Sequence, residues 1–438
     1  MKIYPLLYSL ALLLFFSACH SSQYFSKKEV KELEERLQLS PLGDHFQGLV
    51  VYDPEASEFV YEFQGDKLFT PASNTKILTF RAALEHLADS LPLYEQLNAG
   101  RSMYLRGTGH PAMLHPEFDT YLQEASLQLM MRGFDSLFLY YPEIEPKRFG
   151  SGWAWDDYPY YYQAERSSFP IYGNALQVVW DSLRSEIKLE PDYLAQYSRI
   201  RLGKGTKIEM KREEYINKFD IRVGAQTSHE ARFSVPFLNE PYLLSQLWEN
   251  KMGRVFLSRY EAPRGQWIPQ GKFPTDTLLR KMMWESDNFL AEQILLMVGR
   301  TLTDSLQTSA AIHAIIPDSA QIRWVDGSGL SRYNLLSPNY LVEELDRIQR
   351  MIGWEEIQAY FPANGQQGTL KNRYEQSKEP YIYAKTGTLS NNYNLSGYIK
   401  GASGKWYIFS YMHNHFLGSP NDLQEDIEKV LHHLHQKL

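Results

Sequence analysis

The chain has 438 residues, of which 43% are hydrophobic and 22% are charged, a composition typical of folded globular proteins. This length exceeds that of one compact domain, so two or three domains are expected. The formal net charge of -7 leaves no positive excess to neutralise nucleic-acid phosphates, which argues against nucleic acid as a partner.

Residues 1–19 have the pattern of a bacterial export signal. Lys2 precedes an apolar run, Ile3–Phe16, that is too short to cross a bilayer and is typical of a signal-peptide core. Cys19 is the only cysteine, which excludes an intramolecular disulfide framework. Phe16-Ser17-Ala18-Cys19 resembles a lipobox with Phe16 in place of the usual leucine. The resemblance implies a lipid on Cys19 and an exported lipoprotein at the periplasmic face of a membrane; the alternative is a plain cleaved signal or an uncleaved anchor.

The predicted elements begin with a charged helix, Ser26–Leu39, that tethers the first domain. Two strand-like runs follow, Gly48–Tyr52 and Glu58–Phe63, and both end at turn residues, which predicts a β-hairpin. The next segment, Ser73–Ala88, carries apolar residues at helical spacing and is apolar enough to lie in a core. Ser73 is therefore expected in the first turn of a buried helix.

The middle segment, residues 100–272, alternates short β-like stretches with connections rich in Pro, Gly and Tyr. We interpret it as one or two β-rich domains inserted between residues 20–99 and 273–438, which together form the domain that carries the chemistry. The β-like stretches are Ser136–Tyr140, Arg199–Leu202 and Phe233–Phe237.

Helical periodicity returns after the middle segment, at Asp276–Met283 and Phe289–Gly299. The cap residues Ser286-Asp287-Asn288 lie between the two helices, so this triplet is expected at a corner. Strands and a closing helix complete the chain. These elements are the strands Tyr381–Ala384, Leu395–Lys400 and Trp406–Met412 and the helix Leu423–Lys437.

Ser73 and Lys76 are the first candidate catalytic pair. Residues three apart share one face of a helix, so the serine hydroxyl and the lysine amine can come within hydrogen-bond distance, as a nucleophile and its base require. Free N–H groups in the first turn also favour a developing oxyanion. Lys76 must be neutral to act, so its pKa must fall by about 3 units. Ser185 and Lys188 repeat the spacing without supporting context.

Two more motifs follow this pair, Ser286-Asp287-Asn288 and Lys385-Thr386-Gly387. Together the motifs resemble the active sites of penicillin-binding proteins and serine β-lactamases, which combine a Ser-x-x-Lys helix, a Ser-x-Asn loop and a Lys-Thr-Gly edge strand. Longer segments are similar to the low-molecular-mass class C D-alanyl-D-alanine carboxypeptidase/endopeptidase family. These segments are Phe69–Ser73, Gly152–Asp157, Ser286–Glu292, Asp326–Ser331, Gly368–Leu370 and Ala384–Leu389. One departure is His110, where the family usually has Asp.

The resemblance implies an α/β (α+β) transpeptidase-like fold, in which helices flank an antiparallel sheet and β-rich domains are inserted. It implies a serine-type carboxypeptidase, endopeptidase or both, acting on peptidoglycan stem peptides that end in D-Ala-D-Ala or on their cross-links. β-Lactams are the expected covalent inhibitors, and no metal or cofactor is expected.

The resemblance also implies roles for single residues. Ser73 attacks the penultimate D-Ala carbonyl, Lys76 takes its proton, and Ser286 relays a proton to the leaving amine. The other residues bind substrate: Asn288 orients it, Lys385 and Thr386 hold the terminal carboxylate, Gly387 leaves room along the strand, and the N–H groups of Ser73 and Thr388 form the oxyanion hole. Asp157 matches an acidic position that contacts the amine of diaminopimelate; the alternative is a solvated loop aspartate.

Two other functions remain open at this point. A β-lactamase-like hydrolase would need a water-activating carboxylate that the sequence does not place, and the long insertion argues against it. A peptidoglycan-binding or sensor protein without turnover is disfavoured because every motif is intact. His413 and His415 alternate on a strand, but no third metal ligand is identifiable, so a structural role is favoured.

Overall fold

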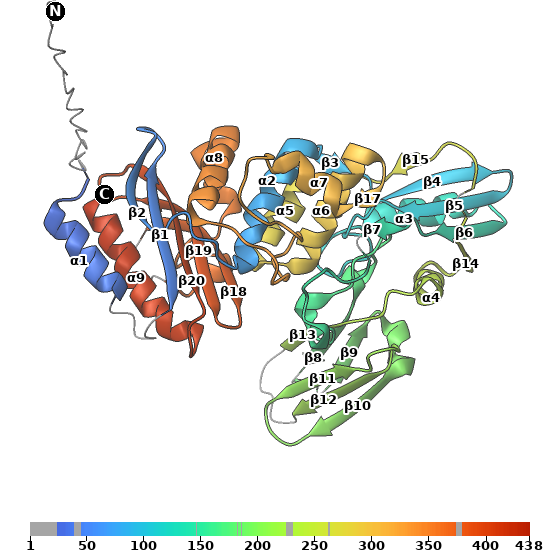
Figure 1. Ribbon diagram of the computed structural model, residues 1–438. Helices are drawn as coiled ribbons and strands as arrows, with labels where there is room; N and C mark the ends of the chain where they lie inside the picture. Colours follow the sequence, from blue (N-terminus) through green and yellow to red (C-terminus); the bar gives the residue numbers. More distant parts are fainter. Residues whose placement is uncertain are drawn as a thin grey trace, which may run out of the picture.

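The computed structural model describes residues 24–38, 45–145, 147–181, 183–184, 186–224, 231–261, 263–373 and 379–438. The predicted signal peptide, Cys19 and Ser185 lie outside these residues. Within the described ranges, no helix is both long and apolar enough to cross a lipid bilayer. The chain folds into helices and several sheets, and the largest antiparallel sheet is formed from its two ends (Figure 1).

That antiparallel sheet has the strand order β18-β19-β20-β1-β2, so the first hairpin pairs with the last strand of the chain. The predicted hairpin is confirmed. The Lys-Thr-Gly motif lies on β18, an edge strand, as the sequence predicted. The strands are β1 (Phe46–Asp53), β2 (Glu58–Phe63), β18 (Ile382–Leu389), β19 (Asn392–Lys400) and β20 (Trp406–Asn414).

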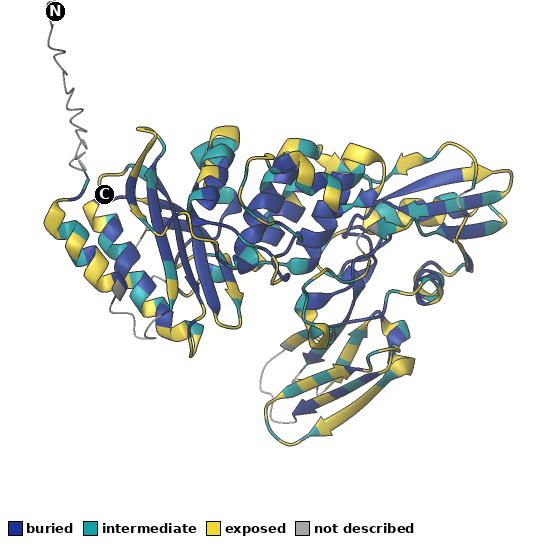
Figure 2. Ribbon diagram, viewed as in Figure 1, coloured by how far each residue is buried: buried dark blue, intermediate teal, exposed yellow. Residues whose placement is uncertain are grey.

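Helices cover both faces of this sheet (Figure 1). α1 (Lys27–Gln38) and α9 (Pro420–Lys437) lie side by side on one face, and α8 (Pro338–Tyr360) packs against the other. Strand β1 is apolar without alternation because Leu49 and Val51 belong to the core beneath α1 and α9, while Val50 belongs to the core on the side of α8. Figure 2 shows the resulting continuous burial along the central strands.

A cluster of helices continues from α8 toward the middle segment and holds most of the larger core. Its centre is α6, whose residues from Phe289 to Gly299 are all buried, and α6 packs against α2 and α7. The expected α+β fold with helices on both sides of an antiparallel sheet is therefore present. The helices are α2 (Lys76–His86), α5 (Thr275–Glu285), α6 (Asn288–Thr303) and α7 (Thr308–Ile315).

The middle segment forms separate sheets, which extend away from the helices in Figure 1. One sheet has the order β14-β6-β5-β4-β15, and two three-stranded sheets have the orders β13-β8-β9 and β10-β12-β11. The strands expected at 136–140, 199–202 and 233–237 are present as β6, β10 and β13. The short pair β17-β7 connects this segment to the helical cluster, and the pair β16-β3 lies where the chain enters and leaves the segment.

The strands of the middle segment are short, and three sheets contain most of them. The first sheet contains β4 (Tyr94–Ala99), β5 (Ser102–Gly107), β6 (Ser136–Tyr140), β14 (Phe256–Arg259) and β15 (Ile268–Gln270). The second and third contain β8 (Ala175–Asp181), β9 (Glu186–Glu190), β10 (Ser198–Gly203), β11 (Ile208–Arg212), β12 (Phe219–Gly224) and β13 (Ala231–Pro236). The short strands are β3 (Ser90–Leu91), β7 (Ile144–Glu145), β16 (Phe273–Pro274) and β17 (Leu306–Gln307).

Two helices in the middle segment were not predicted, α3 (Tyr121–Met131) and α4 (Pro241–Met252). In α3, Leu122 and Leu129 are exposed while Leu127 and Met131 are buried, so the apolar residues do not mark one face. Strand β4 begins before residue 100 and nevertheless pairs with β5 of the middle segment. The segment is thus a mixture of sheets and short helices.

Candidate active site

Ser73 lies in a short 3-10 helix, η1 (Ala72–Thr75), immediately before α2. The sequence predicted the first α-helical turn, but Ala72 has a φ of +49°, which prevents a continuous α-helix through this point. Thr70, just before this turn, is held by two buried asparagine side chains on β19 and β20. The Thr70 N–H donates to Asn414 Oδ1 at 2.6 Å, and Asn394 Nδ2 donates to the Thr70 carbonyl at 3.0 Å. The sheet therefore fixes the turn that carries Ser73.

Lys76 is fully buried at the start of α2. Its Nζ donates to Ser73 Oγ at 3.0 Å, to Asn288 Oδ1 at 2.6 Å and to the Ser328 carbonyl at 2.7 Å. Burial lowers the pKa of Lys76 to about 8, although the nearby carboxylate of Asp287 opposes this fall. The pKa of Lys76 thus falls in the direction that a base for Ser73 requires, and a minor fraction of the amine is neutral at neutral pH.

Ser286, Asp287 and Asn288 form the predicted corner between α5 and α6. Ser286 has a φ of +58° at the end of α5, and the Asp287 side chain caps α6 by accepting from the Leu290 N–H at 2.9 Å. Asn288 accepts from Lys76 through Oδ1 and donates through Nδ2 to the Tyr162 carbonyl at 2.9 Å. Both ends of its amide are fixed, so Asn288 links Lys76 to the middle segment.

Lys385 is a predicted substrate-binding residue on the edge strand β18, and it contacts Ser286. Its Nζ donates to Ser286 Oγ at 2.7 Å and to the Thr386 carbonyl at 2.8 Å. Burial, together with the charge of Lys76, holds the pKa of Lys385 well below its usual range. Lys385 is fully buried and does not line the cleft. The direct contact with substrate that we predicted from the sequence would therefore require the lysine side chain to move.

The structure gives a packing reason for the glycine at position 387, besides the expected room for substrate. A Cβ atom at this position would lie 2.5 Å from the Pro71 carbonyl oxygen and 2.9 Å from the Asn74 nitrogen. The glycine is needed because β18 packs directly against the turn that carries Ser73. Asn74 joins the same elements, since its Nδ2 donates to the Lys385 carbonyl at 2.7 Å.

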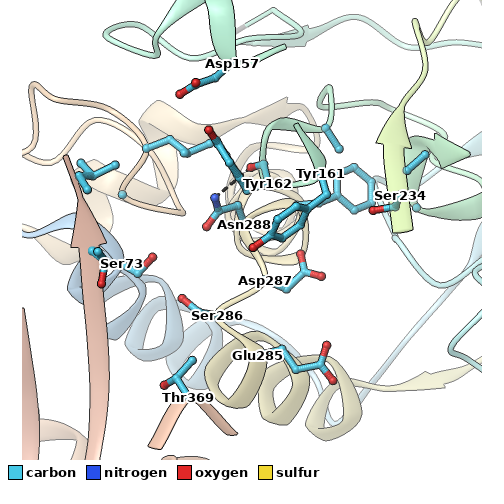
Figure 3. Close-up of a pocket in the computed structure, with 18 of the residues that line it drawn as sticks. Ser73, Asp157, Tyr161, Tyr162, Ser234, Glu285, Ser286, Asp287, Asn288 and Thr369 are labelled. Atoms are coloured by element: carbon cyan, nitrogen blue, oxygen red, sulfur yellow. Dashed lines mark hydrogen bonds between the residues drawn. The ribbon is translucent and has the colours of Figure 1, made fainter. Parts of the chain in front are cut away.

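A cleft of about 780 Å³ opens in front of these residues. Ser73, Ser286, Asn288, Thr386 and Thr388 line it, and Figure 3 shows Ser73 and Ser286 facing the same space. The cleft continues past Asp287 to residues of the middle segment, among them Ser234. It is large enough for more than a terminal dipeptide.

Asp157 also lines this cleft, at the end of the short 3-10 helix η2 (Trp155–Asp157). It is half-buried. Burial and the neighbouring Asp157 carboxylate raise the pKa of the Tyr162 hydroxyl. Asp157 is therefore placed where an extended ligand of Ser73 could reach it.

Several residues that support the site were not singled out individually from the sequence. The Ser328 N–H donates to Glu292 Oε1 at 2.8 Å, and Arg166 pairs with Glu292 Oε2 at 3.1 Å in a fully buried contact. Thr369 accepts a hydrogen bond from Thr386 and lines the cleft. Ser328, Glu292 and Thr369 lie within the segments that resemble the class C family, whereas no sequence signal marks Arg166.

His413 has a structural environment. It is buried on β20, and its Nδ1 lies 2.9 Å from Nε2 of His45. Burial and the neighbouring His45 hold the pKa of His413 well below its usual value. Among the described residues, no group of three or more His, Cys, Asp or Glu side chains is arranged to hold a metal ion.

The fold and the arrangement of Ser73, Lys76, Ser286, Asn288 and Lys385 define a serine enzyme of the penicillin-binding-protein and serine β-lactamase class. A family model described as the D-Ala-D-Ala carboxypeptidase 3 (S13) family matches residues 29–209 and 270–438. The chain belongs to this family. It is a serine-type D-Ala-D-Ala carboxypeptidase and a penicillin-binding protein.

Relatives with this activity are similar over most of the chain. A D-alanyl-D-alanine carboxypeptidase, DacB, of Haemophilus influenzae is 23% identical over 455 residues, covering 94% of this chain and 93% of the relative. A D-alanyl-D-alanine carboxypeptidase of an Actinomadura species is 24% identical over 441 residues, covering 87% and 80%. The crystal structure of penicillin binding protein 4 from Haemophilus influenzae has a TM-score of 0.75 at 19% identity and covers 92% of this chain and 99% of that one.

Proposed function

We propose that Ser73 is the nucleophile and Lys76 the base of a peptidase that acts on the D-Ala-D-Ala end of peptidoglycan stem peptides. The observation that carries this proposal is the contact between the hydroxyl of Ser73 and the buried amine of Lys76, whose pKa is about 8. Neutral Lys76 takes the Ser73 proton while the serine oxygen bonds to the penultimate D-Ala carbonyl carbon. The peptide C–N bond then breaks and leaves an acyl-enzyme.

The leaving D-Ala amine needs a proton as this bond breaks. Ser286 is suited to deliver it because its hydroxyl accepts from Lys385 and lines the cleft. The N–H groups of Ser73 and Thr388 are proposed to hold the oxyanion, and Asn288, fixed at both ends of its amide, orients the substrate. Water then hydrolyses the ester and regenerates Ser73.

Asp157 is proposed to contact an amine on the third residue of the stem peptide. Its carboxylate lines the same cleft as Ser73 and is partly exposed. β-Lactams are proposed to acylate Ser73, because their strained amide presents a carbonyl to the same nucleophile. The solved structure of the Haemophilus influenzae penicillin binding protein 4 with a β-lactam supports this proposal for a related fold.

We also propose a location and a domain organisation. Residues 1–19 act as a lipoprotein signal, and lipid on Cys19 holds the enzyme at the periplasmic face of an envelope membrane. Residues 20–99 and 273–438 form the peptidase domain, apart from β4, which pairs with the inserted part, and residues 100–272 form that β-rich inserted part. Mass spectrometry of the mature protein tests the lipid, since an unmodified Cys19 would contradict it.

The activity is tested with a soluble form that begins at Ser21. It is incubated with benzylpenicillin and, separately, with a peptide ending in D-Ala-D-Ala, and adducts are mapped by peptide mass spectrometry. The proposal expects a slowly decaying adduct on Ser73 and release of D-Ala. Rapid hydrolysis of the drug would instead indicate a β-lactamase. Neither an adduct nor peptide turnover would indicate a binding protein without catalysis.

A further inference from the structure

The part of the cleft wall nearest Lys385 consists of hydroxyl groups. Ser286, Thr369 and Thr386 all line the cleft, whereas Lys385 is fully buried behind them. The lysine touches two of these residues, through Ser286 Oγ and the Thr386 carbonyl. An anion that enters this part of the cleft would therefore meet hydroxyl groups first and the Lys385 amine only behind them.

Thr369 is held rigidly in this wall. It lies in the short 3-10 helix η6 (Gly368–Leu370), where Leu370 is fully buried and its carbonyl accepts from the Gly365 N–H at 3.0 Å. A Cβ atom on Gly368 would lie 2.7 Å from the Trp284 carbonyl oxygen, so η6 packs closely against α5. The preceding loop is tied to β18, because Asn364 Oδ1 accepts from the Ile382 N–H at 2.8 Å.

The hydrogen bond between the two threonines links Thr369 to the proposed carboxylate site. Thr386 Oγ1 donates to Thr369 Oγ1 at 2.9 Å. A threonine hydroxyl has a single proton, so Thr386 can donate to a bound carboxylate only if it stops donating to Thr369. Two arrangements are then open. Either Thr369 donates to Thr386, which keeps the contact between the two threonines, or Thr369 donates to the carboxylate itself. Both arrangements require a hydroxyl group at position 369.

We propose that Thr369 is a specificity-determining residue that binds the terminal carboxylate of the substrate together with Ser286 and Thr386. This inference rests on the proposed function, since it names the group by which that site selects a free C-terminus. Lys385 lies behind the wall and donates a hydrogen bond to Ser286 Oγ. Hydrogen bonds to a charged acceptor are stronger than neutral ones, so loss of the Thr369 hydroxyl reduces selectivity for an anionic ligand by about tenfold.

The test compares benzylpenicillin with its neutral methyl ester. The carboxylate of benzylpenicillin is attached one carbon from the reacting amide nitrogen, as is the carboxylate of a terminal D-Ala. The rate constant for acylation of Ser73 is measured by intact mass for both probes, and their ratio gives the carboxylate preference. Thr369→Val is expected to lower this preference about tenfold by slowing benzylpenicillin alone, and Thr369→Ser is expected to restore it.

Two control variants separate this role from others. Thr301→Val removes a hydroxyl that, among the described residues, bonds only the Met297 carbonyl on α6, and it is expected to leave the preference unchanged. Arg332→Gln tests the exposed cation that also lines the cleft. A preference lost in Arg332→Gln but kept in Thr369→Val would overturn the inference. Equal slowing of both probes in Thr369→Val would also overturn it, because the effect would then be structural.

The wild-type protein distinguishes failure of the inference from failure of the proposed function. Acylation of Ser73 by both probes at equal rates would leave the nucleophile in place and refute a carboxylate site. Absence of any adduct on Ser73 would refute the proposed function, and the inference would fall with it.

Discussion

Arg166 of the middle segment and Glu292 of α6 form an ion pair at 3.1 Å in which both side chains are fully buried. The other oxygen of Glu292 accepts from the Ser328 N–H, and the Ser328 carbonyl accepts from Lys76. The inserted segment is thereby connected to the catalytic lysine through one carboxylate. Replacing either partner alone leaves an uncompensated buried charge, whereas replacing both removes the charges together.

We predict that Glu292→Leu destabilises the fold by about 3–5 kcal/mol, while the double variant Arg166→Met/Glu292→Leu recovers most of this loss. The double variant is still expected to acylate slowly, because the Ser328 N–H has lost its acceptor and the carbonyl that holds Lys76 is no longer fixed. Urea unfolding gives the stability and intact mass gives the acylation rate. A double variant with wild-type acylation would show that the ion pair does not position Lys76.

The acylation rate is predicted to rise with pH and level off above about 8. Lys76 must be neutral to accept the Ser73 proton, and burial places its pKa at about 8, so its neutral fraction falls tenfold per pH unit below that value. Asp287→Asn keeps a good helix cap but removes a negative charge that raises the pKa of Lys76. The rising limb of the curve of acylation rate against pH is therefore expected at lower pH.

A pH series of benzylpenicillin acylation measures this shift. Asp304→Asn is the matched control, because Asp304 caps the far end of the same helix and is not among the charges that act on Lys76. A limb that moves equally in both variants, or toward higher pH in Asp287→Asn, would contradict the assignment of Lys76 as the base.

The motif residues could be predicted because their chemistry is local in sequence. Ser73 and Lys76 are three residues apart, and Ser286 and Asn288 lie at a corner marked by cap residues. Burial could not be predicted in the same way. Whether Lys385 reaches the cleft depends on how β18 packs against η1, and Arg166 meets Glu292 across 126 residues of sequence. The helix α3 was missed because its apolar residues do not mark one clear face. The helix α4 was missed although its buried apolar residues, such as Leu244, Leu247 and Trp248, do recur at helical spacing.

Gly387→Ala is predicted to lower both the melting temperature and the rate of Ser73 acylation. The added Cβ would lie 2.5 Å from the Pro71 carbonyl, so β18 or the turn that carries Ser73 must move. Gly133→Ala is the control, since its Cβ would have only one neighbour, at 3.7 Å. If Gly387 only left room for substrate, peptide turnover would fall while the melting temperature stayed at the wild-type value.

Ser73→Ala is predicted to abolish acylation by benzylpenicillin and to leave the circular dichroism spectrum unchanged, because Ser73 is half-buried and loses only one hydroxyl. Ser185→Ala is the matched control from the repeated Ser-x-x-Lys spacing and is expected to acylate as the wild type does. A drug adduct mapped to Ser185 would refute the assignment of the nucleophile.

Asp157→Asn is predicted to reduce kcat/KM about twofold to fivefold for peptides whose third residue carries a free amine. The carboxylate is partly exposed, so its ion pair with an ammonium is screened by water and contributes modestly. Acetylation of the peptide amine should remove the difference between the variant and the wild type. Asp156→Asn is the control, because Asp156 lines the same cleft but is more exposed. Turnover that depends on Asp157 equally for the free and the acetylated peptide would show that the carboxylate supports the loop rather than the substrate.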